Sequence, residues 1–197
     1  MKQIAALVIV MLCVTTGVSQ AETYRVELNA SNSAIFFGLD AKQYVTQGYM
    51  KYGGSGLYID NDIKKMGLLN FKLMVGSETL FPDLNCEVGF KGLLGYAEEK
   101  NIQKDGSAAA IGFSAVAAYR LPQSISPIPI EFELEFTGAP RPLSFMDINN
   151  YFELKTGVNL YIVDNAALQL NYRFYTIDFG DWRFKDDILL LGLLIEF

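Results

Sequence analysis

Apolar and polar residues alternate with a period of two along most of this chain. The clearest run covers residues 130–136, where Ile130, Phe132, Leu134 and Phe136 are separated by three glutamates. Such alternation is typical of a β-strand whose two faces meet different environments. Beyond its first 21 residues the chain has no run of 18 apolar residues, the pattern of a membrane-spanning helix. The sequence therefore predicts an all-β protein.

Turn-forming residues divide the chain into about ten strands. Clusters of Gly, Pro, Asn and Asp mark the turns, among them Gly53-Gly54 and Asp164-Asn165. The expected strands lie near 23–30 (with a continuation to 38 left open), 44–52, 55–60, 67–76, 84–97, 107–121, 128–137, 151–163, 167–178 and 187–197. If 23–52 contributes one strand or an unpaired arm, the number falls to eight or nine. The connections are too short to contain helices, so neighbouring strands must pair antiparallel.

The first 21 residues have the features of a secretory signal peptide. Lys2 supplies a positive charge, an almost unbroken apolar stretch follows, and small residues precede the expected cleavage after Ala21. The apolar stretch is shorter than the roughly 20 residues that a transmembrane helix needs. We therefore expect residues 1–21 to be removed on export and residues 22–197 to form a single domain.

The exported chain carries a net negative charge and one cysteine. Loss of Lys2 with the leader takes the net charge from −6 to −7, which argues against binding to nucleic acid. Cys86 is then the only cysteine, so no internal disulfide can form. The fold must be stabilised by its own core or by a membrane.

The carboxyl-terminal residues resemble the signal by which the barrel assembly machinery recognises bacterial outer-membrane barrels. Every second residue back from the end is apolar and the last is aromatic, as in Leu189, Leu191, Leu193, Ile195 and Phe197. Aromatic residues also gather near the ends of the expected strands, where lipid head groups would lie. They are Tyr24, Tyr96, Tyr119, Tyr151, Phe152, Tyr161, Phe179 and Trp182.

These features favour a closed antiparallel transmembrane β-barrel of about ten strands, with eight as the alternative, in the outer membrane of a Gram-negative bacterium. A closed barrel leaves no unpaired backbone group in hydrocarbon. A secreted, soluble, lipocalin-like barrel that binds an apolar ligand would show the same alternation with its faces exchanged, so it stays the alternative. If the last strand runs toward the periplasm, 122–127 and 164–166 are periplasmic turns. The outward loops are then 97–106, 138–150 and 179–187.

The stretches 139–158 and 170–179 resemble the YfaZ family of outer-membrane proteins. The residues that carry the resemblance are Ala139-Pro140, Leu143-Ser144-Phe145, Asp147, Tyr151, Glu153, Gly157-Val158 and Tyr172-Arg173. The resemblance covers the last third of the chain. It implies a small barrel in the outer membrane and brings no known activity, ligand or functional residue.

If the apolar faces point outward, the charged residues of the opposite parity line the lumen. They are Arg25, Glu27, Lys72, Glu87, Lys91, Glu131, Glu133, Glu135, Glu153, Lys155, Arg173 and Glu196. Both signs are present, which favours ion pairs that fill a narrow interior over a pore with a ring of one sign. We expect Lys155 and Arg173 to pair with the three glutamates at 131, 133 and 135.

The chain contains no histidine, so the usual general base of hydrolases and the commonest transition-metal ligand are both missing. We therefore expect no enzyme, no cofactor and no metal site. The expected partners are outer-membrane lipid and the assembly machinery, and the oligomeric state is left open. The sequence favours a structural barrel, or a narrow, largely plugged and porin-like channel for small solutes. A surface protein that recognises another cell or a phage through loop 138–150, with Phe145 and Met146 exposed, is a further alternative.

Overall fold

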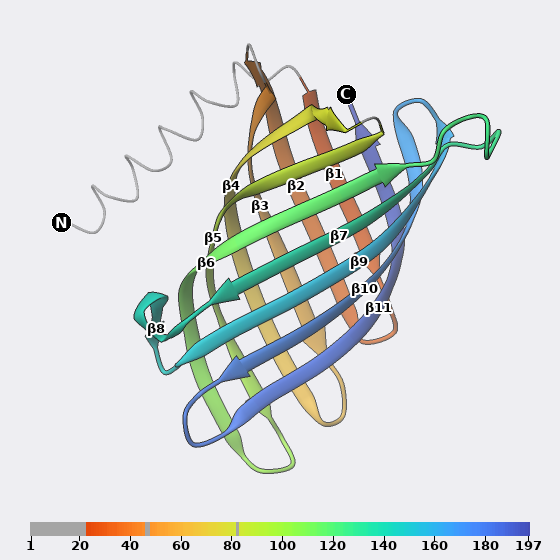
Figure 1. Ribbon diagram of the computed structural model, residues 1–197. Coiled ribbons are helices and arrows are strands. Elements are labelled where there is room, and N and C mark those ends of the chain that lie inside the picture. The colour runs from red at the N-terminus through yellow and green to blue at the C-terminus, as the bar shows by residue number, and fades with distance from the viewer. Residues whose placement is uncertain (1–22, 46–47, 82) are drawn as a thin grey trace.

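Ten long strands pair antiparallel in chain order and close on themselves in the computed structural model, which describes residues 23–45, 48–81 and 83–197 (Figure 1). The strands are β1 (Thr23–Ala30), β2 (Ala34–Val45), β3 (Gly48–Asp60), β4 (Lys64–Phe81), β5 (Leu84–Glu99), β6 (Lys104–Arg120), β7 (Ile130–Ala139), β9 (Asn150–Val163), β10 (Ala166–Asp178) and β11 (Arg183–Glu196). The expected signal peptide, residues 1–21, lies outside the described residues.

The barrel closes where its first and last strands meet. Arg25 of β1 lies opposite Glu196 of β11, and the pairing continues to Ala30 opposite Leu191. Backbone hydrogen bonds of 2.8 and 2.9 Å between Tyr24 and Phe197 extend this seam to the end of the chain. Such closure pairs the backbone groups that a sheet edge would leave open in hydrocarbon.

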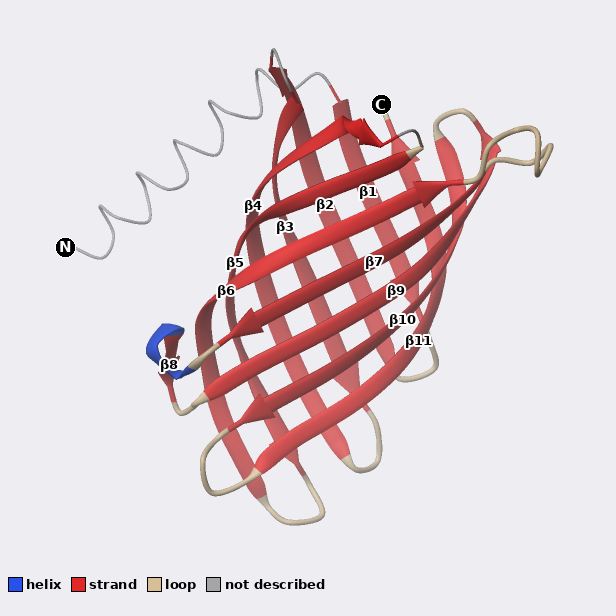
Figure 2. Cartoon of the chain, in the orientation of Figure 1, coloured by secondary structure: helices blue, strands red, loops and turns tan. Residues whose placement is uncertain are grey.

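The connection between β7 and β9 holds the remaining structure. The 3-10 helix η1 (Arg141–Leu143) is followed by the short strand β8 (Ser144–Met146), which pairs with Ala108–Ala110 of β6. Figure 2 shows that strands make up nearly all of the rest of the described chain. None of the helical segments in the described residues has the length and apolar character needed to cross a bilayer.

The outer wall is apolar and the inner wall is largely polar along the middle of the strands. In β7, Phe132 and Leu134 are 45% and 48% exposed, whereas Glu133 between them is 8% exposed. A soluble barrel with an apolar ligand inside would show the reverse parity. The expected fold, a closed antiparallel transmembrane β-barrel of ten strands, is confirmed.

The connections fall into two groups at opposite ends of the barrel (Figure 1). We call the end with the connections 31–33, 61–63, 100–103, 140–149 and 179–182 the loop end. The end with the connections 121–129 and 164–165 and with the carboxyl terminus is the terminal end. The expected outward loops thus share one end, and the expected periplasmic turns share the other.

The prediction of a turn at Gly53-Gly54 is wrong, and the strand 34–45 was missed. Gly53 lies inside β3, paired with Asp40 of β2 and Lys72 of β4. A Cβ atom on Gly53 would lie 2.1 Å from Asp40 Oδ1, so glycine is needed for the close approach of two strands rather than for a turn.

Four aromatic residues expected at the lipid interface lie in or against the interior instead. Tyr151, Tyr161 and Phe179 are buried and Trp182 packs against the buried apolar cluster, while Tyr96 and Tyr119 are exposed on the outer face. Nearness to a strand end does not distinguish the two faces, because the face is set by the parity of the residue along its strand.

Candidate functional site: the barrel lumen

The lumen near the loop end is filled by apolar side chains. Ile59 and Met66 come from β3 and β4, and Ile177, Phe184 and Leu190 come from β10 and β11; all five are fully buried and belong to one cluster. We call this cluster the apolar plug. Phe179 and Trp182 of the β10–β11 connection add to it, with rings stacked 4.3 Å apart. The inward faces of these strand ends are largely apolar, with the pair Lys64–Asp186 of β4 and β11, at 3.2 Å, as a charged exception.

The middle of the lumen is filled by ion pairs, some of which join strands that are not neighbours. Lys91 Nζ of β5 lies 2.9 Å from Glu135 Oε1 of β7 and 2.7 Å from Glu153 Oε2 of β9. Arg173 of β10 approaches the other oxygen of Glu153 at 3.3 Å and stacks its guanidinium over the Phe36 ring. Ions removed from water are stable only when paired and hydrogen-bonded in this way.

A second group of charges lies beside the first. Lys155 Nζ is 2.6 Å from Glu133 Oε1 and 3.4 Å from Glu27 Oε2. Arg25 contacts the same two glutamates at 3.0 and 3.2 Å. Two cations and two anions therefore alternate in this cluster, so each charged group contacts two groups of opposite sign.

Together these two groups form what we call the ion-pair layer. Five of its side chains share a void of only about 20 Å³ with the inner faces of β2, β3 and β4, which is the space of about one water molecule. A chain of side-chain hydrogen bonds continues beside it. The Asn29 amide donates to Gln169 at 2.8 Å, Gln169 donates to Asn159 at 2.9 Å, and Asn159 donates to the Glu131 carboxylate at 3.0 Å. The layer is a packed barrier of polar groups.

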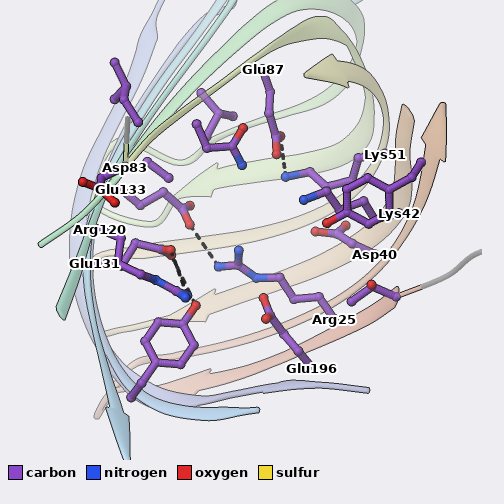
Figure 3. A pocket seen from close by; sticks show the side chains of 17 residues that line it. Arg25, Asp40, Lys42, Lys51, Asp83, Glu87, Arg120, Glu131, Glu133 and Glu196 are labelled. Atoms are coloured by element: carbon purple, nitrogen blue, oxygen red, sulfur yellow. Dashed lines mark hydrogen bonds and ion pairs between the residues drawn. The ribbon is translucent and has the colours of Figure 1, made fainter. Parts of the chain in front are cut away.

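A cavity of about 520 Å³, which we call the cup, opens at the terminal end (Figure 3). Thr23 and Glu196, at the ends of their strands, contribute to its wall, and the pairs Arg25–Glu133 and Lys51–Glu87 lie deeper. Arg120 stacks on the Tyr161 ring 4.4 Å from its centroid. Its charged lining, six acidic and four basic side chains, has both signs side by side, unlike the single-sign ring of a selective pore.

All twelve charged residues expected in the lumen have inward parity, but they do not form a single network. Glu27, Glu133, Glu135, Glu153, Arg25, Lys91, Lys155 and Arg173 belong to the ion-pair layer. Lys72, Glu87 and Glu131 pair instead with Asp40, Lys51 and Arg120, and Glu196 lines the cup.

The expected pairing of the β7 glutamates was right for Lys155 and wrong for Arg173. Lys155 pairs with Glu133 as expected, whereas Arg173 pairs with Glu153 of the neighbouring strand. Glu135 pairs with Lys91 across the lumen. Strand β9 lies between β7 and β10, so Arg173 meets Glu153 on the adjacent strand, whereas Lys91 reaches Glu135 across the narrow lumen.

Sequence reasoning missed several lumen residues. Asp40 and Lys51 were missed because the boundaries of β2 and β3 were wrong, so their parity was not assigned. The uncharged residues Asn29, Asn70, Asn159, Gln169 and Asn171 are also buried. Their inward parity along alternating strands was the signal that could have identified them.

Two other expected features lie outside the lumen. The residues of the terminal assembly signal, Leu189, Leu191, Leu193, Ile195 and Phe197, all project outward, and their recognition by the assembly machinery stays a prediction. In the β7–β9 connection, Phe145 and Met146 are exposed and Met146 has a φ of 62°. A recognition role for this loop also stays a prediction. Among the residues that the structure describes, no three His, Cys, Asp or Glu side chains come together as ligands for a metal ion.

Comparisons with known proteins give one family match. The family model described as "YfaZ precursor" matches residues 1–192. No curated protein matches the chain.

The chain is also similar to solved structures. One titled "NanC porin structure in rhombohedral crystal form" is 7% identical, with a TM-score of 0.44, over 88% of this chain and 98% of that chain. A second, titled "Unveiling the Mechanism Behind the in-meso Crystallization of Membrane Proteins", is 18% identical, with a TM-score of 0.42, over 89% of this chain and 82% of that chain.

Proposed function

The chain belongs to the YfaZ family, and from this membership and its filled lumen we propose that it is an integral outer-membrane barrel with a structural, non-conducting role. The leader at residues 1–21 directs its export. The loop end faces the outside of the cell, and the cup faces the periplasm. The proposed role is non-enzymatic and needs no cofactor.

The observation that carries this proposal is the pair of barriers stacked in the lumen. The ion-pair layer leaves a void of about 20 Å³, and the apolar plug lies beyond it toward the loop end. A hydrated ion would have to break several buried ion pairs and then enter an apolar cluster. The cup is therefore a cavity that opens only at the terminal end.

Conductance in planar bilayers tests this role. The folded chain, inserted and checked by its heat-modifiable migration on gels, should give no steady single-channel current. Bilayers that receive detergent alone serve as the baseline. A reproducible open-channel current from the wild-type barrel would contradict the closed lumen.

Location needs its own measurement, because a closed lumen would not identify the membrane. After cell fractionation the chain should stay with the outer membrane and need detergent for release. Recovery of the folded chain from the aqueous periplasm would contradict the proposed location.

A further inference from the structure

An apolar trough runs along the outward face of β3, outside the lumen. Gly54 and Gly56 occupy two successive outward positions and leave the floor of the trough without side chains. Gly54 lies between Leu39 of β2 and Phe71 of β4. Gly56 lies between Phe37 and Leu69 on the same two strands. All four flanking side chains are exposed, so they form two ridges with a bare strip between them.

The strip widens into a hollow of about 570 Å³ toward the loop end. Its lining comes from β2, β3, β4 and β5, which lie side by side in Figure 1, and includes Ile35, Tyr58, Leu94 and Tyr96. These side chains are exposed and aliphatic or aromatic. The hollow therefore offers an occupant an apolar surface and two tyrosine side chains.

Packing does not require glycine at these two positions. A Cβ atom on Gly56 would meet only Leu69 Cδ2 at 3.6 Å, and one on Gly54 would come no closer than 3.5 Å to any atom. By contrast, a Cβ atom on Gly53 or Gly95 would lie 2.1 Å from a neighbouring oxygen. Glycine inside a strand costs stability and often marks a place where another group approaches the backbone closely. Gly54 and Gly56 stand at successive outward positions between two apolar ridges, as a single outward glycine such as Gly92 does not.

The outer wall of a transmembrane barrel at this height faces hydrocarbon, so the occupant of the trough is apolar along Gly54 and Gly56. Tyr58 and Tyr96 stand at the loop-end edge, and the Tyr58 hydroxyl donates to Asp60 Oδ2 at 3.0 Å. Tyrosines with such a polar contact are typical of the level of lipid head groups. This arrangement suits a molecule with an apolar tail beside the glycines and a polar end near the tyrosines.

The size of the floor distinguishes a lipid chain from a second barrel. Two outward positions cover about 7 Å along the strand, and the ridges stand two strand spacings, about 10 Å, apart. The bare floor is thus on the order of 70 Å², whereas a stable protein interface buries about 800 Å² on each partner. A single extended chain fits this strip, and a barrel wall would bridge over it.

We propose that the trough between the Phe37–Leu39 and Leu69–Phe71 ridges is a binding site for one acyl chain of a membrane lipid, with the lipid head group beside Tyr58 and Tyr96. The affinity of the site comes from the hydrocarbon chain and not from the head group. It is independent of the proposed role of the lumen.

The test fills the trough with a side chain. In Gly56→Leu the new side chain occupies the floor, and the open space around Gly56 allows the strand to keep its register. Gly92→Leu is the matched control, because Gly92 also faces outward and its Cβ would meet only Phe71 O at 3.8 Å, yet it lies on β5 outside the trough. Heat-modifiable migration verifies that each variant is folded.

Native mass spectrometry of the detergent-purified barrel, incubated with palmitoyl-oleoyl phosphatidylglycerol or phosphatidylethanolamine, measures the bound lipid. The wild type and Gly92→Leu should each retain one lipid of either kind. In Gly56→Leu the affinity should fall by about tenfold or more, because the acyl chain loses apolar contact area. If this variant does not fold, Gly54→Leu fills the same floor and should show the same loss.

Four results would overturn the proposal. The trough-filling variant could retain lipid as well as the wild type, or the control could lose it equally. A strong preference for one lipid head group would mean that the site recognises the head group and not the acyl chain. A wild-type dimer that becomes a monomer in Gly56→Leu would assign the trough to a second copy of this chain.

Discussion

The two halves of the lumen are enclosed by the same ten strands, yet they are filled by opposite chemistry. At the loop end, Ile59, Met66 and Leu190 pack in an apolar plug. Toward the terminal end, Arg25 and Glu133 belong to a polar interior that opens into a cavity of about 520 Å³. The outer wall is apolar beside both halves. The bilayer thus constrains only the outward parity, and the inward parity can differ along the barrel.

The two halves also resist disruption for different reasons. The plug depends on close packing, so removing a side chain leaves a cavity. The ion-pair layer depends on mutual neutralisation, so removing one charge leaves its partners buried without compensation. Substitutions in the two halves should therefore differ in how much stability they remove. They should also differ in which replacement side chain restores it.

The largest loss of stability is expected from Lys91→Ala in the ion-pair layer. Lys91 is buried and contacts both Glu135 and Glu153. Its removal leaves Glu135 without its ion pair in a low-dielectric interior, which should cost about 3–5 kcal/mol. Guanidinium-induced unfolding of the barrel in phospholipid vesicles measures the change.

Lys100→Ala is the matched control for this prediction. Lys100 also pairs with a carboxylate, Asp60 at 2.8 Å, but that pair is exposed at the loop end. Exposed pairs contribute little, so this variant should unfold close to the wild type. Equal losses in the two variants would mean that burial of the ion-pair layer is not what makes Lys91 important.

A somewhat smaller loss is expected from Phe184→Ala in the apolar plug. Phe184 is fully buried, and its ring meets Trp182 edge-on at 6.5 Å. The substitution should cost about 3 kcal/mol through lost burial and a residual cavity. The same unfolding measurement applies, and Phe184→Leu should recover most of the stability because it largely restores the apolar volume. Failure of leucine to rescue would show that the plug depends on the shape of the ring.

The sequence predicted the architecture best where the strands alternate. From residue 130 onward the expected and observed strands agree closely, because Phe132, Leu134 and their neighbours are separated by charged residues that only the lumen can accommodate. In β2 the adjacent Phe36 and Phe37 face opposite sides, which hides the period of two. The boundaries there could not be read from pattern alone.

The sequence predicted which charged residues line the lumen, but not which of them contact one another. Parity identified Lys91 and Glu153 as lumen residues, yet their contact joins β5 to β9 across the barrel. That pairing depends on how strands stagger around the closed wall, which no local pattern encodes. The apolar plug was missed for a related reason. Leu57 and Leu68 are apolar residues among apolar neighbours, so they show no contrast between the two faces.

The smallest effect is expected at the loop end, where an exposed pair ties the β10–β11 connection to β6. The Lys104 ammonium donates a hydrogen bond of 2.5 Å to Asp181 Oδ2, which holds the pKa of that carboxyl below its ordinary value of 3.8. A carboxyl with a lowered folded-state pKa adds stability above its unfolded pKa and loses it as the pH falls through the folded value.

Asp181→Asn should therefore unfold slightly more easily than the wild type at pH 7, and the difference should vanish well below the ordinary carboxyl pKa. The informative quantity is the difference in free energy of unfolding between Asp181→Asn and the wild type at each pH, because all other groups are common to both proteins. Lys104→Met removes the partner, and in that background Asp181→Asn should have no effect at either pH. A difference that persists in acid, or in the Lys104→Met background, would show that Asp181 acts through a contact other than this pair.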